Sequence, residues 1–98
     1  ANNREEQIIM KAVVTVIGKD TVGILAKIST LCAKHKANVM DVTQTIMQDL
    51  FAMIMLVDIT ELDIDFLVLS DELSAAGEEM GLSVHVMRED IFNSMHRI

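Results

Sequence analysis

The 98-residue sequence holds a single cysteine, few basic residues and no long apolar segment. A lone cysteine, Cys32, cannot form an internal disulfide, which suits a reducing cytoplasm. No run of apolar residues is long enough to span a bilayer, and the first residues lack the apolar stretch of a secretory signal peptide. We therefore expect a cytoplasmic protein with no membrane partner.

Basic residues are outnumbered, since 8 Lys and Arg against 15 Asp and Glu give a formal net charge of −7. No basic stripe follows any expected element, so nucleic acid is not expected as a direct partner. Aromatic residues make up only 3% of the chain, but it has eight methionines and is 51% hydrophobic. Methionine adapts to irregular packing, so these side chains suggest a methionine-lined interface or core, and we favour the core. Length and hydrophobicity together predict one folded domain.

Residue patterns for catalysis or metal binding are also missing. The histidines His35, His85 and His96 lie on different expected elements, and no second cysteine accompanies Cys32. We expect His35 to cap the end of the first helix and the other two to be ordinary surface or sheet residues. Acidic residues that share one helix face are more often solvated than catalytic; here they are Asp71, Glu72, Glu78 and Glu79. We expect no catalytic residue, no metal ligand and no cofactor.

A short turn bracketed by two glycines is the main candidate for a functional site. An apolar run ends at Gly18, and a helical pattern begins at Ile24 directly after Gly23. N–H groups at the start of a helix are unpaired and can hold an anionic group. The turn is not a phosphate loop, because its lysine lies between the glycines and no Gly-Lys-Ser/Thr follows. The other interpretation is that the glycines only permit a tight corner and close helix–sheet packing.

Hydrophobic periodicity predicts four strands and three helices. The strands are expected over 10–17, 38–48, 51–59 and 82–87, and the helices from Ile24, from Asp63 or Asp65, and over 90–98. The first and third strands are apolar on both faces, which is typical of the middle of a sheet. A turn at Asp49-Leu50 is expected to make the second and third strands a hairpin.

Four local features accompany these elements. Asp20 or Thr21 is expected to cap the first helix. Gln44 lies within an apolar series in the second strand and requires a partner if it is buried. Gly77 inside the second helix indicates a close crossing over the sheet, and Gly81 stands where the residue after a helix belongs.

Right-handed crossovers turn this order of elements into a ferredoxin-like βαββαβ arrangement of the α+β class. It has a four-stranded antiparallel sheet with two helices on one face, plus a C-terminal helix. The other face is left bare although two of its strands are apolar on both sides, so the terminal helix, a second subunit or both must cover it. We therefore expect at least a homodimer.

The apolar run, the sequence Gly-Lys-Asp-x-x-Gly-Ile, the helix and Asn38 at the start of the second strand together resemble an ACT domain, a small regulatory module that binds amino acids or similar metabolites. The resemblance covers an ACT domain over 10–88, which a C-terminal helix over 89–98 follows. Residues 1–9 are mostly polar and charged, and we expect them to be a leader, a cloning remnant or an upstream coding segment. The resemblance is closest to short bacterial proteins made of a single ACT domain, and looser to the ACT domains of glycine-cleavage transcriptional antiactivators.

In the ACT family, the corner after the first strand and the start of the second strand line a ligand pocket at a subunit interface. Carried over by motif, this implies ligand-binding roles for Gly18, Asp20, Gly23, Ile24 and Asn38. The resemblance thus implies a non-enzymatic regulatory module that senses an amino acid or related metabolite and acts on a separate protein partner. The alternative is a structural or adaptor protein that uses its open sheet face to bind other proteins and has no small ligand.

Overall fold

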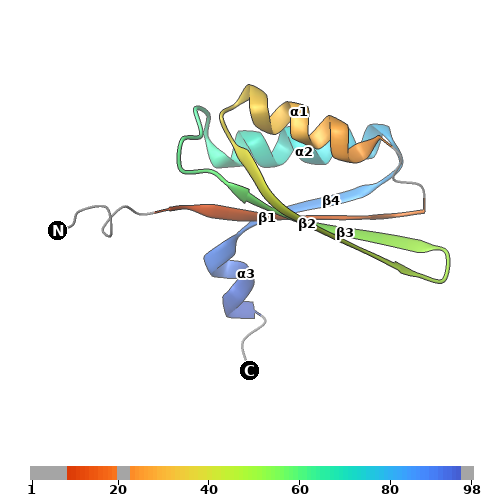
Figure 1. Ribbon diagram of the computed structural model, residues 1–98. Coiled ribbons are helices and arrows are strands. Elements are labelled where there is room, and N and C mark those ends of the chain that lie inside the picture. Colours follow the sequence, from red (N-terminus) through yellow and green to blue (C-terminus); the bar gives the residue numbers. More distant parts are fainter. Residues whose placement is uncertain (1–8, 20–22, 96–98) are drawn as a thin grey trace.

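A computed structural model describes residues 9–19 and 23–95. Along the chain lie β1 (Lys11–Gly18), α1 (Ile24–Lys34), β2 (Asn38–Met47), β3 (Leu50–Asp58), α2 (Phe66–Glu79), β4 (Ser83–Arg88) and α3 (Glu89–Met95). The strands form one antiparallel sheet in the order β2-β3-β1-β4. Helices α1 and α2 cover one face, and α3 projects from the other (Figure 1). The predicted ferredoxin-like arrangement and C-terminal helix are confirmed.

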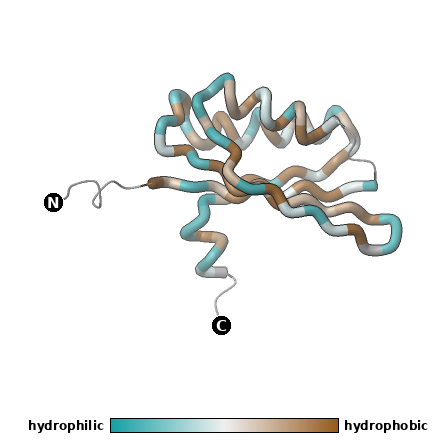
Figure 2. The backbone as a smooth tube through the Cα atoms, viewed as in Figure 1, coloured by the Kyte–Doolittle hydropathy of each residue, from teal (hydrophilic) through white to brown (hydrophobic). Residues whose placement is uncertain are grey.

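The core fills the space between the sheet and the two covering helices. Strands β1 and β3 are central, as their two-sided hydrophobicity predicted, and their helix-facing residues are buried. Leu69 and Leu73 of α2 and Ile24 and Ile28 of α1 pack onto them. Figure 2 shows hydrophobic residues recurring along the helices and strands of both layers. Met53 and Met55 contribute to this core, whereas Met10, Met40 and Met80 are exposed, so the core placement expected for the methionines holds only in part.

Strand β2 departs from the regular alternation expected from its sequence. The register shifts between Val39 and Asp41, so Val39 and Val42 both pack against the core although they are three residues apart. Met40 is consequently exposed. Gln44, on the edge strand β2, is also exposed. Because it is exposed, Gln44 does not need the partner that its place in an apolar series suggested.

The hairpin turn lies one residue earlier than expected. Met47 pairs with Leu50, which leaves Gln48 and Asp49 as the turn, and Gln48 has a positive φ of 57°. The expected turn at Asp49-Leu50 was wrong because glutamine gives no sequence signal for this left-handed conformation.

Both covering helices end in the same hydrogen-bonded motif. At the end of α2, the Gly81 and Leu82 N–H groups donate to the carbonyls of Glu78 and Gly77, and Gly81 has the predicted left-handed conformation at φ 75°. At the end of α1 the corresponding left-handed residue is Lys36, at φ 65°. The two helices thus stop alike, although only α2 has the glycine that usually marks such an end.

The close crossing predicted at Gly77 is confirmed. A Cβ atom added there would overlap the side chain of Val84 on β4. On the opposite sheet face α3 contacts β1 and β4, while Ile17 and Ile54 remain exposed. The terminal helix therefore covers only part of the bare face.

Candidate functional site

The corner between β1 and α1 is shaped by its two glycines. Gly23 is the N-cap of α1 and has a left-handed backbone, with φ 86° and ψ −12°. No side-chain hydrogen bond caps this helix in the described part of the chain. The N-cap residue is therefore Gly23, whereas Asp20 or Thr21 was expected to cap this helix. Those two residues lie outside the described part of the chain.

The two glycines are needed for different reasons. A Cβ atom at Gly18 would overlap the side chain of Leu82, so this position needs space. At Gly23 only Met80 Cε, among the residues that the structure describes, comes near such an atom, at 3.7 Å. What Gly23 supplies is its positive φ, which L-residues adopt at a cost. Ile24 follows with a buried side chain that belongs to the core, so only its backbone can face a ligand.

A shallow hollow of about 400 Å³ lies beside the corner. It is lined by Gly23, Ala26, Lys27, Thr30 and Leu31. Lys27 gives it one positive charge, and the N-terminus of α1 adds the partial positive charge of unpaired N–H groups. The hollow therefore suits a small anionic group such as a carboxylate.

Asn38 does not share this hollow within one chain. Gly18 pairs with Phe51 at one end of β3, whereas Asn38 pairs with Asp58 at the other end. The seven intervening steps correspond to about 23 Å of strand. Of the residues implied by the resemblance, Gly18, Gly23 and Ile24 are thus neighbours, and Asn38 can join them only from a second copy.

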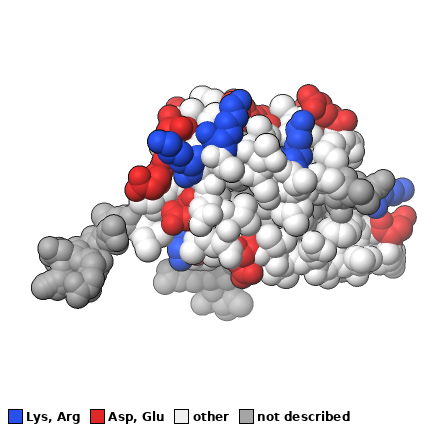
Figure 3. All heavy atoms as spheres, turned by 45° about the horizontal axis from the view of Figure 1, so that its top comes forward, with Lys and Arg blue, Asp and Glu red and all other residues white. Residues whose placement is uncertain are grey.

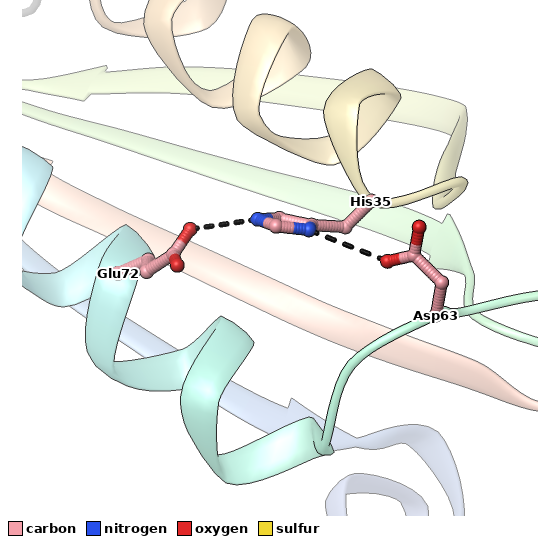
Figure 4. Close-up of polar contacts among 3 residues, drawn as sticks. All are labelled: His35, Asp63 and Glu72. Atoms are coloured by element: carbon pink, nitrogen blue, oxygen red, sulfur yellow. Dashed lines mark hydrogen bonds and ion pairs between the residues drawn. The ribbon is translucent and has the colours of Figure 1, made fainter.

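A partly buried polar cluster joins the far end of α1 to α2. His35 Nε2 lies 2.9 Å from Glu72 Oε1, and His35 Nδ1 lies 3.3 Å from Asp63 Oδ1 (Figure 4). The histidine side chain is only 11% exposed, while those of Glu72 and Asp63 are 36% and 41% exposed. Carboxylates only accept hydrogen bonds, so only an imidazole with hydrogen on both nitrogens satisfies both contacts. The cluster fastens α1, α2 and the loop between β3 and α2 together.

The sequence predicted only half of this arrangement. His35 does occupy the C-cap position of α1, as expected, but its side chain serves the cluster. Glu72 was expected on a solvated helix face, which was wrong because it bonds to His35. The one available signal was that His35 continues the apolar stripe of α1. Its partners lie 28 and 37 residues away and gave no signal.

The described residues offer no other chemical site. No group of three or more His, Cys, Asp or Glu side chains among them could hold a metal ion. Cys32 is buried, as expected, and burial raises the pKa of its thiol, which keeps the thiol protonated and unreactive. Within residues 9–19 and 23–95, no helix is long and apolar enough to cross a membrane.

The fold and the glycine corner together define a small domain of the ferredoxin-like type. The family model described as "ACT domain" matches residues 11–87, and the chain therefore belongs to the ACT domain family. ACT domains are a family of regulatory ligand-binding modules. The predicted resemblance is confirmed.

Relatives of similar length support this assignment. The chain is 56% identical over 88 residues to the UPF0237 protein MJ1558 of Methanocaldococcus jannaschii, covering 90% of this chain and 98% of the relative. An ACT domain protein from Streptococcus pneumoniae has a similar structure, with a TM-score of 0.73 and 33% identity over 87% of this chain and 96% of that one. The relatives are thus archaeal as well as bacterial, a wider range than the bacterial proteins expected.

A more distant structure is that of a candidate glycine cleavage system transcriptional repressor. Its TM-score is 0.63 at 19% identity, and the match covers 84% of this chain and 47% of that one. At this identity the likeness concerns the fold alone.

Proposed function

We propose that this protein is a non-enzymatic regulatory module of the cytoplasm that senses an amino acid or a related small metabolite where two copies of the chain meet. The observation that carries the proposal is the glycine corner, where the left-handed Gly23 presents the start of α1 beside an open hollow. The binding unit is residues 10–88, followed by the terminal helix over 89–98. Membership of a ligand-binding family supports the same interpretation.

The ligand would be held by its charged backbone-like groups. Its carboxylate would accept hydrogen bonds from the N–H groups at the start of α1, and its ammonium group would lie near the Asp20 carboxylate. Asn38, which offers a donor and an acceptor, would come from the second copy because the corner of its own chain is about 23 Å of strand away. An amino acid carries both charges that this arrangement needs.

The first experiment is a thermal-shift screen against the twenty amino acids and common metabolites. A ligand that binds only the folded protein raises the melting temperature. Any hit is then titrated by calorimetry into the parent, Asp20→Ala and Asn38→Ala, with Asp71→Ala and Asn93→Ala as exposed controls. We expect roughly tenfold or greater weakening in the first two variants only. Parental affinity in both variants would place the ligand elsewhere.

Mixing the two variants tests whether the site is shared between copies. Each heterodimer of Asp20→Ala and Asn38→Ala chains holds one intact pair, Asp20 from one chain and Asn38 from the other. Random pairing in a 1:1 mixture therefore restores tight binding at about a quarter of all sites. A mixture that binds no better than the separate variants would show that both residues act within one chain.

The alternative function is that of an adaptor that binds proteins through its open sheet face. The observation that favours it is the exposure of Ile54 and Ile17 on that face, at 41% and 37%. The adaptor interpretation predicts that no small molecule shifts the melting temperature. It also predicts that Ile54→Lys releases a bound protein partner, whereas the sensor interpretation predicts an unchanged ligand affinity in that variant.

A further inference from the structure

A charged groove runs between α1 and α2 on the outer surface of the helix layer. Its volume is about 310 Å³. One wall, from α1, holds Lys27, Leu31 and Lys34; the other, from α2, holds Glu72, Ala75, Ala76 and Glu79. Figure 3, in which the helix layer is turned toward the viewer, shows basic and acidic side chains lying over the helices. One wall is thus basic and the other acidic, with small and apolar residues between them.

The helices run in opposite directions, which sets the order of these charges. The Asp63 N–H just before α2 donates to the carbonyl of His35 at the end of α1. At the other end of the helix pair, Met80 lies beside Gly23. Lys34 is therefore opposite Glu72, and Lys27 is opposite Glu79.

Most of these charges have no partner of their own. Among the described residues, Lys27, Lys34 and Glu79 take part in no ion pair or side-chain hydrogen bond, and Glu72 bonds only to His35. Three of the four charges can therefore meet opposite charges on another molecule without breaking an existing contact.

We propose that the helix layer binds the helix layer of a second copy of this chain, in addition to the contact that the ligand site requires. A two-fold axis along the groove places α1 of each copy over α2 of the other. Since this rotation keeps positions along the groove, Lys27 of one copy faces Glu79 of the other, and Lys34 faces Glu72. The same patch on both copies is then complementary to itself, as a two-fold interface requires.

The charge pattern also disfavours a second way in which two copies could meet face to face. A two-fold axis across the groove would place α1 over α1 and α2 over α2, so that lysine faces lysine and glutamate faces glutamate. Like charges opposed in this way disfavour association. Only the axis along the groove brings every charge against one of opposite sign.

An exposed apolar residue adds to the surface that the second copy would cover. Val68 shares one side of α2 with Glu72, Ala75 and Glu79, since their spacings of four, three and four residues follow the helical repeat. It is 44% exposed. Together with Leu31, it supplies apolar contact between the charged walls.

The test uses charge reversal, with association measured by analytical ultracentrifugation in the absence of ligand. Lys27→Glu sets the new carboxylate of one copy against Glu79 of the other, and Glu79→Lys sets the new ammonium group against Lys27. We expect each variant alone to associate roughly tenfold more weakly or worse. Lys36→Glu and Glu61→Lys, which make the same charge changes outside the groove, are the matched controls and should associate like the parent.

Mixing the two reversed chains should restore association, because both contacts in the heterodimer then join a glutamate to a lysine. The double variant Lys27→Glu/Glu79→Lys should likewise regain parental association with itself. Added salt should weaken the parental contact, since exposed charges are screened. Parental association by both single variants, or mixed chains that associate no better than each alone, would overturn the proposal. Because Lys27 also lines the hollow beside the corner, its variants do not test the proposed ligand site, which is tested by Asp20→Ala and Asn38→Ala.

Discussion

Replacing Gly77 with alanine is expected to destabilise the protein, although alanine is the better helix former. Inside a helix, alanine is favoured over glycine by about 1 kcal/mol. At this position, however, the added Cβ overlaps the Val84 side chain and lies 3.1 Å from Val84 Cβ, which is fixed to the strand. Rotation of the valine cannot relieve the second contact, so α2 must move away from β4. Overpacking of this kind costs about 1 to 3 kcal/mol. We therefore expect a net loss of up to about 2 kcal/mol in the free energy of unfolding.

Urea unfolding at fixed protein concentration, followed by circular dichroism, measures this loss. Val84→Ala, which costs about 2 to 3 kcal/mol through lost burial, removes the overlapping methyl group. In that background only the 3.1 Å contact with the Cβ of residue 84 remains, so Gly77→Ala should cost clearly less than it does in the parent. Ala75→Gly, at an exposed position of α2, calibrates helix propensity. If Gly77→Ala stabilises the parent, or destabilises both backgrounds equally, the steric argument is refuted.

Three further predictions concern other positions. Lys36→Gly should raise the free energy of unfolding by about 0.5 to 1 kcal/mol, because Lys36 has a φ of 65° that only glycine adopts without strain; a drop in urea midpoint would contradict this. Hydrogen bonds from Thr60 lower the pKa of Asp58, so Asp58 stabilises the fold above the ordinary aspartate pKa of about 3.9 and that stability is lost as the pH falls. Asp58→Asn should therefore be less stable than the parent at neutral pH and lose less stability on acidification, and parallel pH profiles would exclude this role. Cys32, buried and with a raised pKa, should react with a thiol reagent only as fast as the protein unfolds, and rapid labelling in native buffer would show that α1 opens locally.

The order and type of the elements could be predicted because each long segment has a clear hydrophobic pattern. Strand β1 is apolar on both faces, and Ile24, Ile28 and Leu31 follow the helical repeat. The details that failed depend on backbone conformations with no residue signal. Gln48 is left-handed without being glycine or asparagine, and a register shift at Met40 breaks the alternation of β2.

The candidate site was predictable only where a residue type limits the backbone. The two glycines of the corner were the sequence signal for the site, since the absence of a Cβ atom at Gly18 provides space and Gly23 provides a positive φ. The separation of Asn38 from that corner could not be foreseen from sequence spacing, because it follows from the register of both strands on β3. The contacts of His35 were hidden for a similar reason, since its partners are distant in the chain. The role of Asp20 stays a prediction.

The distance between the corner and Asn38 bears on how a sensor of this design would respond to its own abundance. If the two halves of the site belong to different chains, ligand binding and chain association are thermodynamically linked, and each strengthens the other. Dilution of the protein would then lower its apparent affinity for the ligand, and ligand would hold together pairs that otherwise separate. The amount of protein in the cell would set the metabolite concentration at which it switches.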